Sequence, residues 1–78
     1  MAYIEIVTKP ACPHCIQAKN ILSSNGIDYR ETMIGEHVTR EQVLSLYPDA
    51  KTVPIIIVDG ERLGGLSELI NMVDRKQL

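Results

Sequence analysis

The stretch Lys9-Pro10-Ala11-Cys12-Pro13-His14-Cys15 joins an apolar, strand-like run at 2–8 to a segment of helical character at 13–25. It therefore places two cysteines, two residues apart, at the start of a helix. A thiol in the first turn of a helix faces unpaired backbone N–H groups and the positive end of the helix dipole. Both favour the thiolate, which is the species that attacks a disulfide. This placement predicts a redox-active pair.

The residue between the first cysteine and the histidine supports this helix start. Pro13 suits the first helical position because its missing N–H falls where no intrahelical partner exists. With Cys12 as the N-cap, Cys15 follows one turn later and can close a Cys12–Cys15 bond. A metal site and inert core cysteines are the alternatives. A structural zinc site is less favoured than an iron–sulfur cluster, because the chain has a single CxxC and neither histidine follows at finger spacing.

Length and charge narrow the class of protein. The 78 residues predict a single domain, 1–78, and the formal net charge of −2 gives no electrostatic footprint for nucleic acid. No apolar run approaches membrane-spanning length, and the first residues resemble no signal peptide. We therefore expect a cytoplasmic protein with no membrane contact, where a stable structural disulfide is unusual.

The first half of the chain predicts a strand–helix–strand unit. The run 2–8 is apolar on both faces, as in a central strand. The helix 13–25 should end at Gly26, a typical C′ glycine. The segment 28–33 alternates as an edge strand, for which we expect Tyr29 and Met33 on one face and Glu31 on the other. Two strands joined by a helix in this length should run parallel.

The second half predicts a helix, a hairpin and a last helix. The capping-box pattern at 39–42 opens a helix whose apolar stripe contains Val43, Leu46 and Tyr47, and a proline at 48 ends it. A strand at 55–58 follows Pro54, and the hairpin signal at 59–60 leads to a strand at 61–63. Glycines at 64 and 65 break that strand before a helix with apolar residues at 66, 69, 70 and 73. The order β-α-β-α-β-β-α predicts an α/β fold with a four-stranded mixed sheet and helices on both faces.

Three motifs in this order resemble the glutaredoxins over essentially the whole chain: Cys12-Pro13-His14-Cys15, Thr52-Val53-Pro54 and Gly64-Gly65-Leu66-Ser67-Glu68. The resemblance implies a thioredoxin-like fold and a dithiol enzyme with a CPHC active site. Cys12 then looks like the nucleophile and Cys15 like the resolving thiol. Pro54 looks like the family's cis-proline, which holds the backbone of Val53 beside Cys12.

The resemblance also implies a glutathione site. Its expected residues are Lys9, Cys12, His14, Thr52, Val53, Pro54, Gly65, Ser67 and Glu68. Ser67 and Glu68 stand at a helix start, where backbone N–H groups bind a carboxylate readily. The two glycines, 64 and 65, should leave room for the ligand's backbone. Lys9, Arg40 and Lys51 are the candidates for another glutathione carboxylate, and the sequence does not choose between the last two.

Two residues are expected to tune the nucleophile. Lys9 and a partly charged His14 should both favour the Cys12 thiolate. Many glutaredoxins have tyrosine where His14 stands, and aspartate is commoner than Glu68. The pair Pro13-His14 is also found in oxidising periplasmic thiol oxidases. We do not expect their function here, because the chain is too small to include their inserted helical domain and shows no export signal.

The expected activity is reduction of protein disulfides and glutathione mixed disulfides by a monomer. Glutathione is the expected reductant, and no tightly bound cofactor is expected. Partners by resemblance are glutathione and disulfide-containing proteins, ribonucleotide reductase among them. The alternative is a glutaredoxin dimer that shares an iron–sulfur cluster through Cys12 and glutathione. Pro13 argues against that alternative, since cluster-binding relatives usually have a smaller or more flexible residue there.

Overall fold

The secondary structure follows the order that the sequence predicts. The computed structural model describes residues 3–48 and 52–75. Within these residues the elements are β1 (Ile4–Thr8), α1 (Pro13–Ser24), β2 (Arg30–Met33), α2 (Arg40–Leu46), β3 (Ile55–Val58), β4 (Glu61–Gly64) and α3 (Leu66–Asp74). They form the thioredoxin-like α/β fold with a mixed four-stranded sheet, which confirms the predicted fold class.

The sheet has the strand order β2-β1-β3-β4, so β1 is central and β2 lies at an edge, as predicted. β1 and β2 are parallel, and β3 runs antiparallel to both β1 and β4. Asp59 and Gly60 turn the chain from β3 into β4 with φ angles of 51° and 87°. Two positive φ angles are the signature of a type I′ hairpin turn. The predicted hairpin is confirmed.

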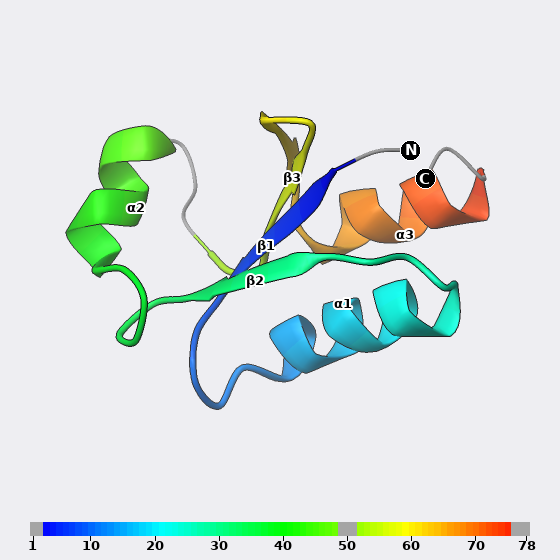
Figure 1. Cartoon of the computed structure of the whole chain (residues 1–78), viewed down its shortest axis with the longest axis horizontal. Coiled ribbons are helices and arrows are strands. Elements are labelled where there is room, and N and C mark those ends of the chain that lie inside the picture. The colour runs from blue at the N-terminus through cyan, green and yellow to red at the C-terminus, as the bar shows by residue number, and fades with distance from the viewer. Residues whose placement is uncertain (1–2, 49–51, 76–78) are drawn as a thin grey trace.

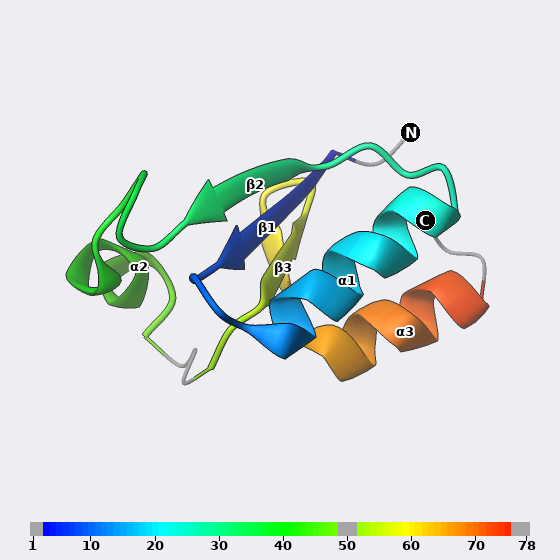
Figure 2. The ribbon, with the colours of Figure 1, turned by 90° about the horizontal axis from the view of Figure 1, so that it is seen from below.

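Helices cover both faces of the sheet. Figures 1 and 2 show α1 and α3 together on one face, with α2 on the other side of the sheet. The cluster between the sheet and the α1–α3 layer consists of Ile4, Ile6, Ala18, Leu22, Ile56 and Leu69. The cluster on the α2 face consists of Val7, Val43, Ile55 and Ile57. β1 contributes to both clusters, which is why its sequence is apolar on both faces.

A glycine ends α1 as predicted. Gly26 has a φ of 68° and follows the C-cap residue Asn25. Its N–H donates to the Ser23 carbonyl at 3.1 Å, and the next N–H, of Ile27, donates to the Leu22 carbonyl at 2.9 Å. These two bonds make a Schellman motif, which satisfies carbonyls left free at a helix end.

α2 begins as predicted but packs less than predicted. The Thr39 hydroxyl accepts from the Gln42 N–H at 3.1 Å, and the Gln42 side chain accepts from the Thr39 N–H at 2.7 Å. Val43 is buried and Tyr47 is half-buried, but Leu46 is 73% exposed. The assignment of Leu46 to the apolar stripe is therefore wrong, because this seven-residue helix buries only Val43.

Two predicted strands have different bounds or faces. β2 begins at Arg30 rather than at 28, and Ala2, predicted in the first strand, lies outside the described residues. The expectation that Glu31 faces away from Tyr29 is wrong. Tyr29 packs on the cluster beneath α1, and the Glu31 carboxylate accepts a hydrogen bond from Lys19 of α1. Residues two apart in an extended chain share a face, so these two side chains lie together.

Candidate functional site

The CxxC pair forms the turn between β1 and α1. Ala11 adopts the left-handed conformation with a φ of 55°, which costs a non-glycine residue about 1 kcal/mol. Cys12 is extended and caps α1, with Pro13 at the helix start. The Cys12 Sγ accepts a hydrogen bond from the Cys15 N–H at 3.2 Å. The predicted cap is confirmed, and the capping atom is the Cys12 sulfur at the N-terminus of α1.

Cys15 is the more deeply buried of the two thiols. Its exposed fraction is 1%, compared with 6% for Cys12, and both cysteines are free. Burial first, and then the hydrogen bond to Cys12, raise the pKa of the Cys15 thiol to about 11, while the Lys19 cation acts in the opposite direction. Cys15 is therefore a protonated thiol at neutral pH.

A first cavity lies at the start of α3, and we call it the α3-side cavity. Its volume is about 320 Å³. The predicted glutathione residues that line it are His14, Thr52, Val53, Pro54, Gly65, Ser67 and Glu68. The Val53–Pro54 peptide bond is cis, as the resemblance implies. Segments far apart in the sequence thus meet at the CxxC end of the sheet.

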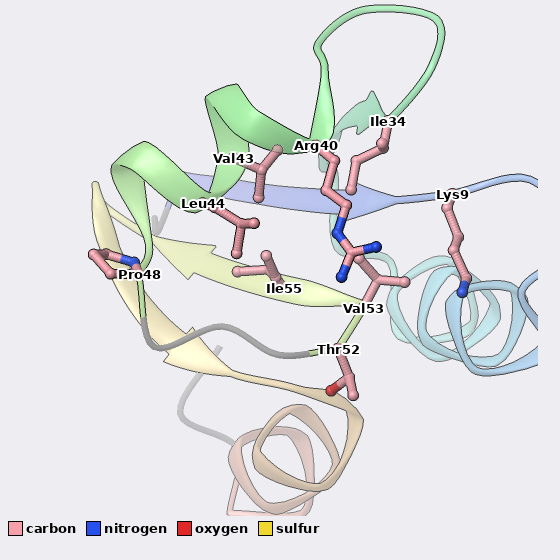
Figure 3. Close-up of a pocket in the computed structure, with 9 residues that line it drawn as sticks. All are labelled: Lys9, Ile34, Arg40, Val43, Leu44, Pro48, Thr52, Val53 and Ile55. Carbon is pink, nitrogen blue, oxygen red and sulfur yellow. The ribbon is translucent and has the colours of Figure 1, made fainter.

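A second cavity lies between α2 and the sheet, and we call it the α2-side cavity. Its volume is about 350 Å³, and it is lined by Lys9 and Arg40 as well as by apolar residues. Thr52 and Val53 line both cavities. Figure 3 shows Arg40 extending from the start of α2 toward Val53. Lys51, the other predicted candidate, lies outside the described residues.

Two predicted residues have different surroundings from those expected. Gly64 belongs to β4 rather than interrupting it, and a Cβ there would lie 2.6 Å from the Glu68 Cγ. Gly64 thus makes room for the Glu68 side chain, and it also lines the α3-side cavity. The Glu68 Oε1 accepts from the Gly65 N–H at 2.9 Å, so this carboxylate also caps α3. Cys12 lines neither cavity.

A polar cluster of Thr8, Lys19 and Glu31 was not predicted. Thr8 is 1% exposed, and its hydroxyl donates to the Glu31 Oε2 at 2.7 Å. The Lys19 Nζ donates to the same oxygen at 3.0 Å. Each residue comes from a different element, so no spacing in the sequence indicates the cluster. A polar residue at the buried end of the central strand, Thr8, was the one available signal.

The described residues also limit other kinds of site. No helix within 3–48 and 52–75 is long and apolar enough to cross a membrane. In the same residues, no three side chains of His, Cys, Asp or Glu gather as a metal-binding group. On this fold, a thiol caps a helix, and His14 of that helix lines the same cavity as a cis-proline. These features define the class of redox proteins built on the thioredoxin fold.

Comparisons with known proteins identify the family within that class. A family model described as Glutaredoxin matches residues 4–63. Glutaredoxin 3 of Escherichia coli is 36% identical over 69 residues, which cover 88% of this chain and 83% of that protein. The crystal structure of glutaredoxin 1 from Francisella tularensis complexed with cacodylate is 28% identical with a TM-score of 0.80, and the match covers 99% of this chain and 98% of that one.

A more distant match shows the fold alone. The buckwheat glutaredoxin–glutathione complex is 17% identical with a TM-score of 0.81, and the match covers 99% of this chain and 73% of that one. The family model and the curated relative together show that this chain belongs to the glutaredoxin family. It is accordingly a thiol–disulfide oxidoreductase by family.

Proposed function

We propose that this protein reduces protein disulfides and glutathione mixed disulfides through both cysteines, with glutathione as the reductant. The observation that carries the proposal is the hydrogen bond from the Cys15 N–H to the Cys12 Sγ at the start of α1. A donor aimed at the sulfur and the positive end of a helix both stabilise a thiolate. Cys12 is thus proposed as the nucleophile, and exposed His14 and Lys9 as residues that add positive charge near it.

The proposed reaction on a protein disulfide has two steps. The Cys12 thiolate attacks one sulfur of the substrate, forms a mixed disulfide and releases the other substrate sulfur as a thiolate that takes up a proton. Cys15 then attacks the Cys12 sulfur, which forms the Cys12–Cys15 bond and releases the second substrate thiol. The proton of Cys15 leaves with the departing sulfur. The substrate is reduced by two electrons and the dithiol is oxidised by two.

Glutathione is proposed to return the Cys12–Cys15 disulfide to the dithiol, two molecules being oxidised to one glutathione disulfide. β3 begins at Ile55, so the backbone of Val53 precedes the ladder and is placed to pair with an extended peptide. The first turn of α3, at Ser67 and Glu68, offers N–H groups to a carboxylate. The buckwheat glutaredoxin was solved as a glutathione complex, which supports the choice of ligand.

The two cavities suit the two ends of that tripeptide. The α3-side cavity combines helix N–H groups with the Glu68 carboxylate, which suits an end that carries both a carboxylate and an ammonium group. The α2-side cavity presents Lys9 and Arg40, which suits an end that carries a carboxylate alone. We therefore propose that glutathione lies across Val53 with its γ-glutamyl end toward α3. No observation favours the iron–sulfur alternative.

Single-cysteine variants test the roles of the two thiols. Cys12→Ser is expected to abolish all thiol–disulfide exchange, because no other described thiol caps the helix. Cys15→Ser is expected to keep reduction of a glutathione mixed disulfide, which needs one thiol, and to lose turnover of a protein disulfide. Single-turnover assays with a glutathionylated peptide and a disulfide peptide measure the two activities. Loss of both in Cys15→Ser would overturn the assignment.

A further inference from the structure

The polar cluster of Thr8, Lys19 and Glu31 links three elements through one oxygen atom. The Glu31 Oε2 of β2 accepts from Thr8 at the end of β1 and from Lys19 of α1. The side chains of Lys19 and Glu31 are 25% and 27% exposed, so this ion pair is only partly hydrated. The hydrogen bond to Glu31 raises the pKa of Lys19 above its ordinary value, so the ammonium group stays charged at neutral pH.

This ammonium group is carried by the same helix as the resolving thiol. Lys19 follows Cys15 by four residues on α1, and residues at this spacing are neighbours on one helix face. Charged and polar groups acting on the Cys15 sulfur are Cys12 in the turn, the backbone of Lys9, and Lys19. Within residues 3–48 and 52–75, Lys19 is the only cationic side chain among these groups, and Glu31 acts on Lys19.

We propose that Lys19 is a positioning residue for the resolving step, held by Glu31 and Thr8 so that its charge stabilises the Cys15 thiolate as it forms. This inference rests on the proposed two-thiol mechanism. In that step Cys15–SH attacks the Cys12 sulfur of Cys12–S–S–R, and the products are Cys12–S–S–Cys15 and R–SH. Cys15 must lose its proton while it is 1% exposed, so a fixed positive charge lowers the cost of this loss.

The test isolates the resolving step. A mixed disulfide between Cys12 and a chromogenic thiol is prepared, and the release of that thiol is followed by stopped flow from pH 6 to 10. We expect Lys19→Met to slow the release by about threefold to tenfold at pH 7, the size of a charge interaction in a partly hydrated site. The pH profile should shift upward, because the thiolate of Cys15 forms at higher pH without the cation. Lys19→Arg should restore most of the rate.

Controls separate charge placement from a structural ion pair. Glu31→Gln keeps an oxygen acceptor for Thr8 and Lys19, so Lys19 stays in place and the release should slow less than in Lys19→Met. A merely structural pair predicts equal slowing in Lys19→Met and Glu31→Gln. Arg30→Gln removes an exposed positive charge from β2 and should leave the profile unchanged. Thermal unfolding of each variant confirms that a folded protein is measured, and Lys19→Gln replaces Lys19→Met if the latter does not fold.

The outcomes distinguish this inference from the proposed function. In a Cys15→Ser background, Lys19→Met should not change the reduction of a glutathionylated peptide, which bypasses the resolving step. If wild type carries out both reactions and Lys19→Met leaves the release rate and its pH profile unchanged, the inference fails and the function stands. If wild type does not release the thiol through Cys15, the two-thiol function itself fails.

Discussion

Gly64 and Gly65 are neighbours that differ in how they tolerate a side chain. Gly64 is buried with a φ of 146°, outside the range that alanine adopts readily, and a Cβ there would meet the Glu68 side chain. Gly65 has an ordinary φ of −108°, and its Cβ would lie 3.5 Å from the Pro54 carbonyl oxygen, a normal contact. Of these two positions, only position 64 requires glycine for its backbone conformation.

Replacing each glycine by alanine tests this difference. Gly64→Ala should lower the free energy of unfolding by about 2 kcal/mol, because it combines a strained backbone with a side-chain clash. Gly65→Ala should leave it unchanged or raise it by up to about 1 kcal/mol, since alanine restricts the unfolded chain. Chemical denaturation of both variants measures the two values. Equal losses would show that the β4–α3 junction tolerates neither side chain.

At the scale of elements, the pair between Lys19 and Glu31 ties α1 to the edge strand β2. The hydrogen bond from Thr8, and then the contact with Lys19, hold the pKa of Glu31 below its ordinary value of 4.5, against an opposing effect of burial. A lowered pKa in the folded state means that the ionised carboxylate stabilises the fold above pH 4.5. The contribution disappears as the pH falls through the folded-state pKa.

Glu31→Gln should show this dependence directly. At pH 7 we expect the free energy of unfolding of the variant to be about 1 kcal/mol lower than that of wild type. This is the size of a charged hydrogen bond that is not fully buried. The difference should shrink below pH 4.5 and vanish once wild-type Glu31 is protonated. Urea denaturation from pH 7 to 3 checks the curve. A difference that is constant with pH would assign the loss to packing instead of charge.

The elements were largely predictable because their signals are local. Pro13 at a helix start, Gly26 at a helix end and the turn at 59–60 each act through the backbone of a few neighbouring residues. Leu46 was mispredicted because helical spacing cannot show how far a short helix extends past the sheet. The left-handed conformation of Ala11 carries no sequence signal, since alanine rarely adopts it.

At the scale of the whole molecule, the fold brings together Lys9, Arg40 and Val53 from three separate segments around the α2-side cavity. The position of Arg40 at this cavity depends on how α2 sits on the sheet, and helix periodicity contains no information on that placement. The Cys12–Cys15 pair, by contrast, lies within one turn and was fully predictable. Sites within one segment can be inferred from local sequence, whereas sites between segments need either a family resemblance, as for the α3-side cavity, or the packed structure.

Arg40 gives a test at this scale. Arg40→Gln should raise the KM for glutathione by roughly fivefold, as expected for one exposed charge pair, with little change in kcat. The effect should diminish at high salt, because such pairs are screened. Arg75→Gln, which removes a positive charge at the C-cap of α3, is the matched control. An unchanged KM in Arg40→Gln would place the carboxylate of glutathione elsewhere.

The strip of chain at Thr52 and Val53 is a wall common to both cavities. In the proposed pose of glutathione, a substitution at this strip would alter the surroundings of both ends of the tripeptide at once. Arg40 and Arg62 each border one cavity only. A substitution at either arginine would therefore change the lining of one cavity at a time.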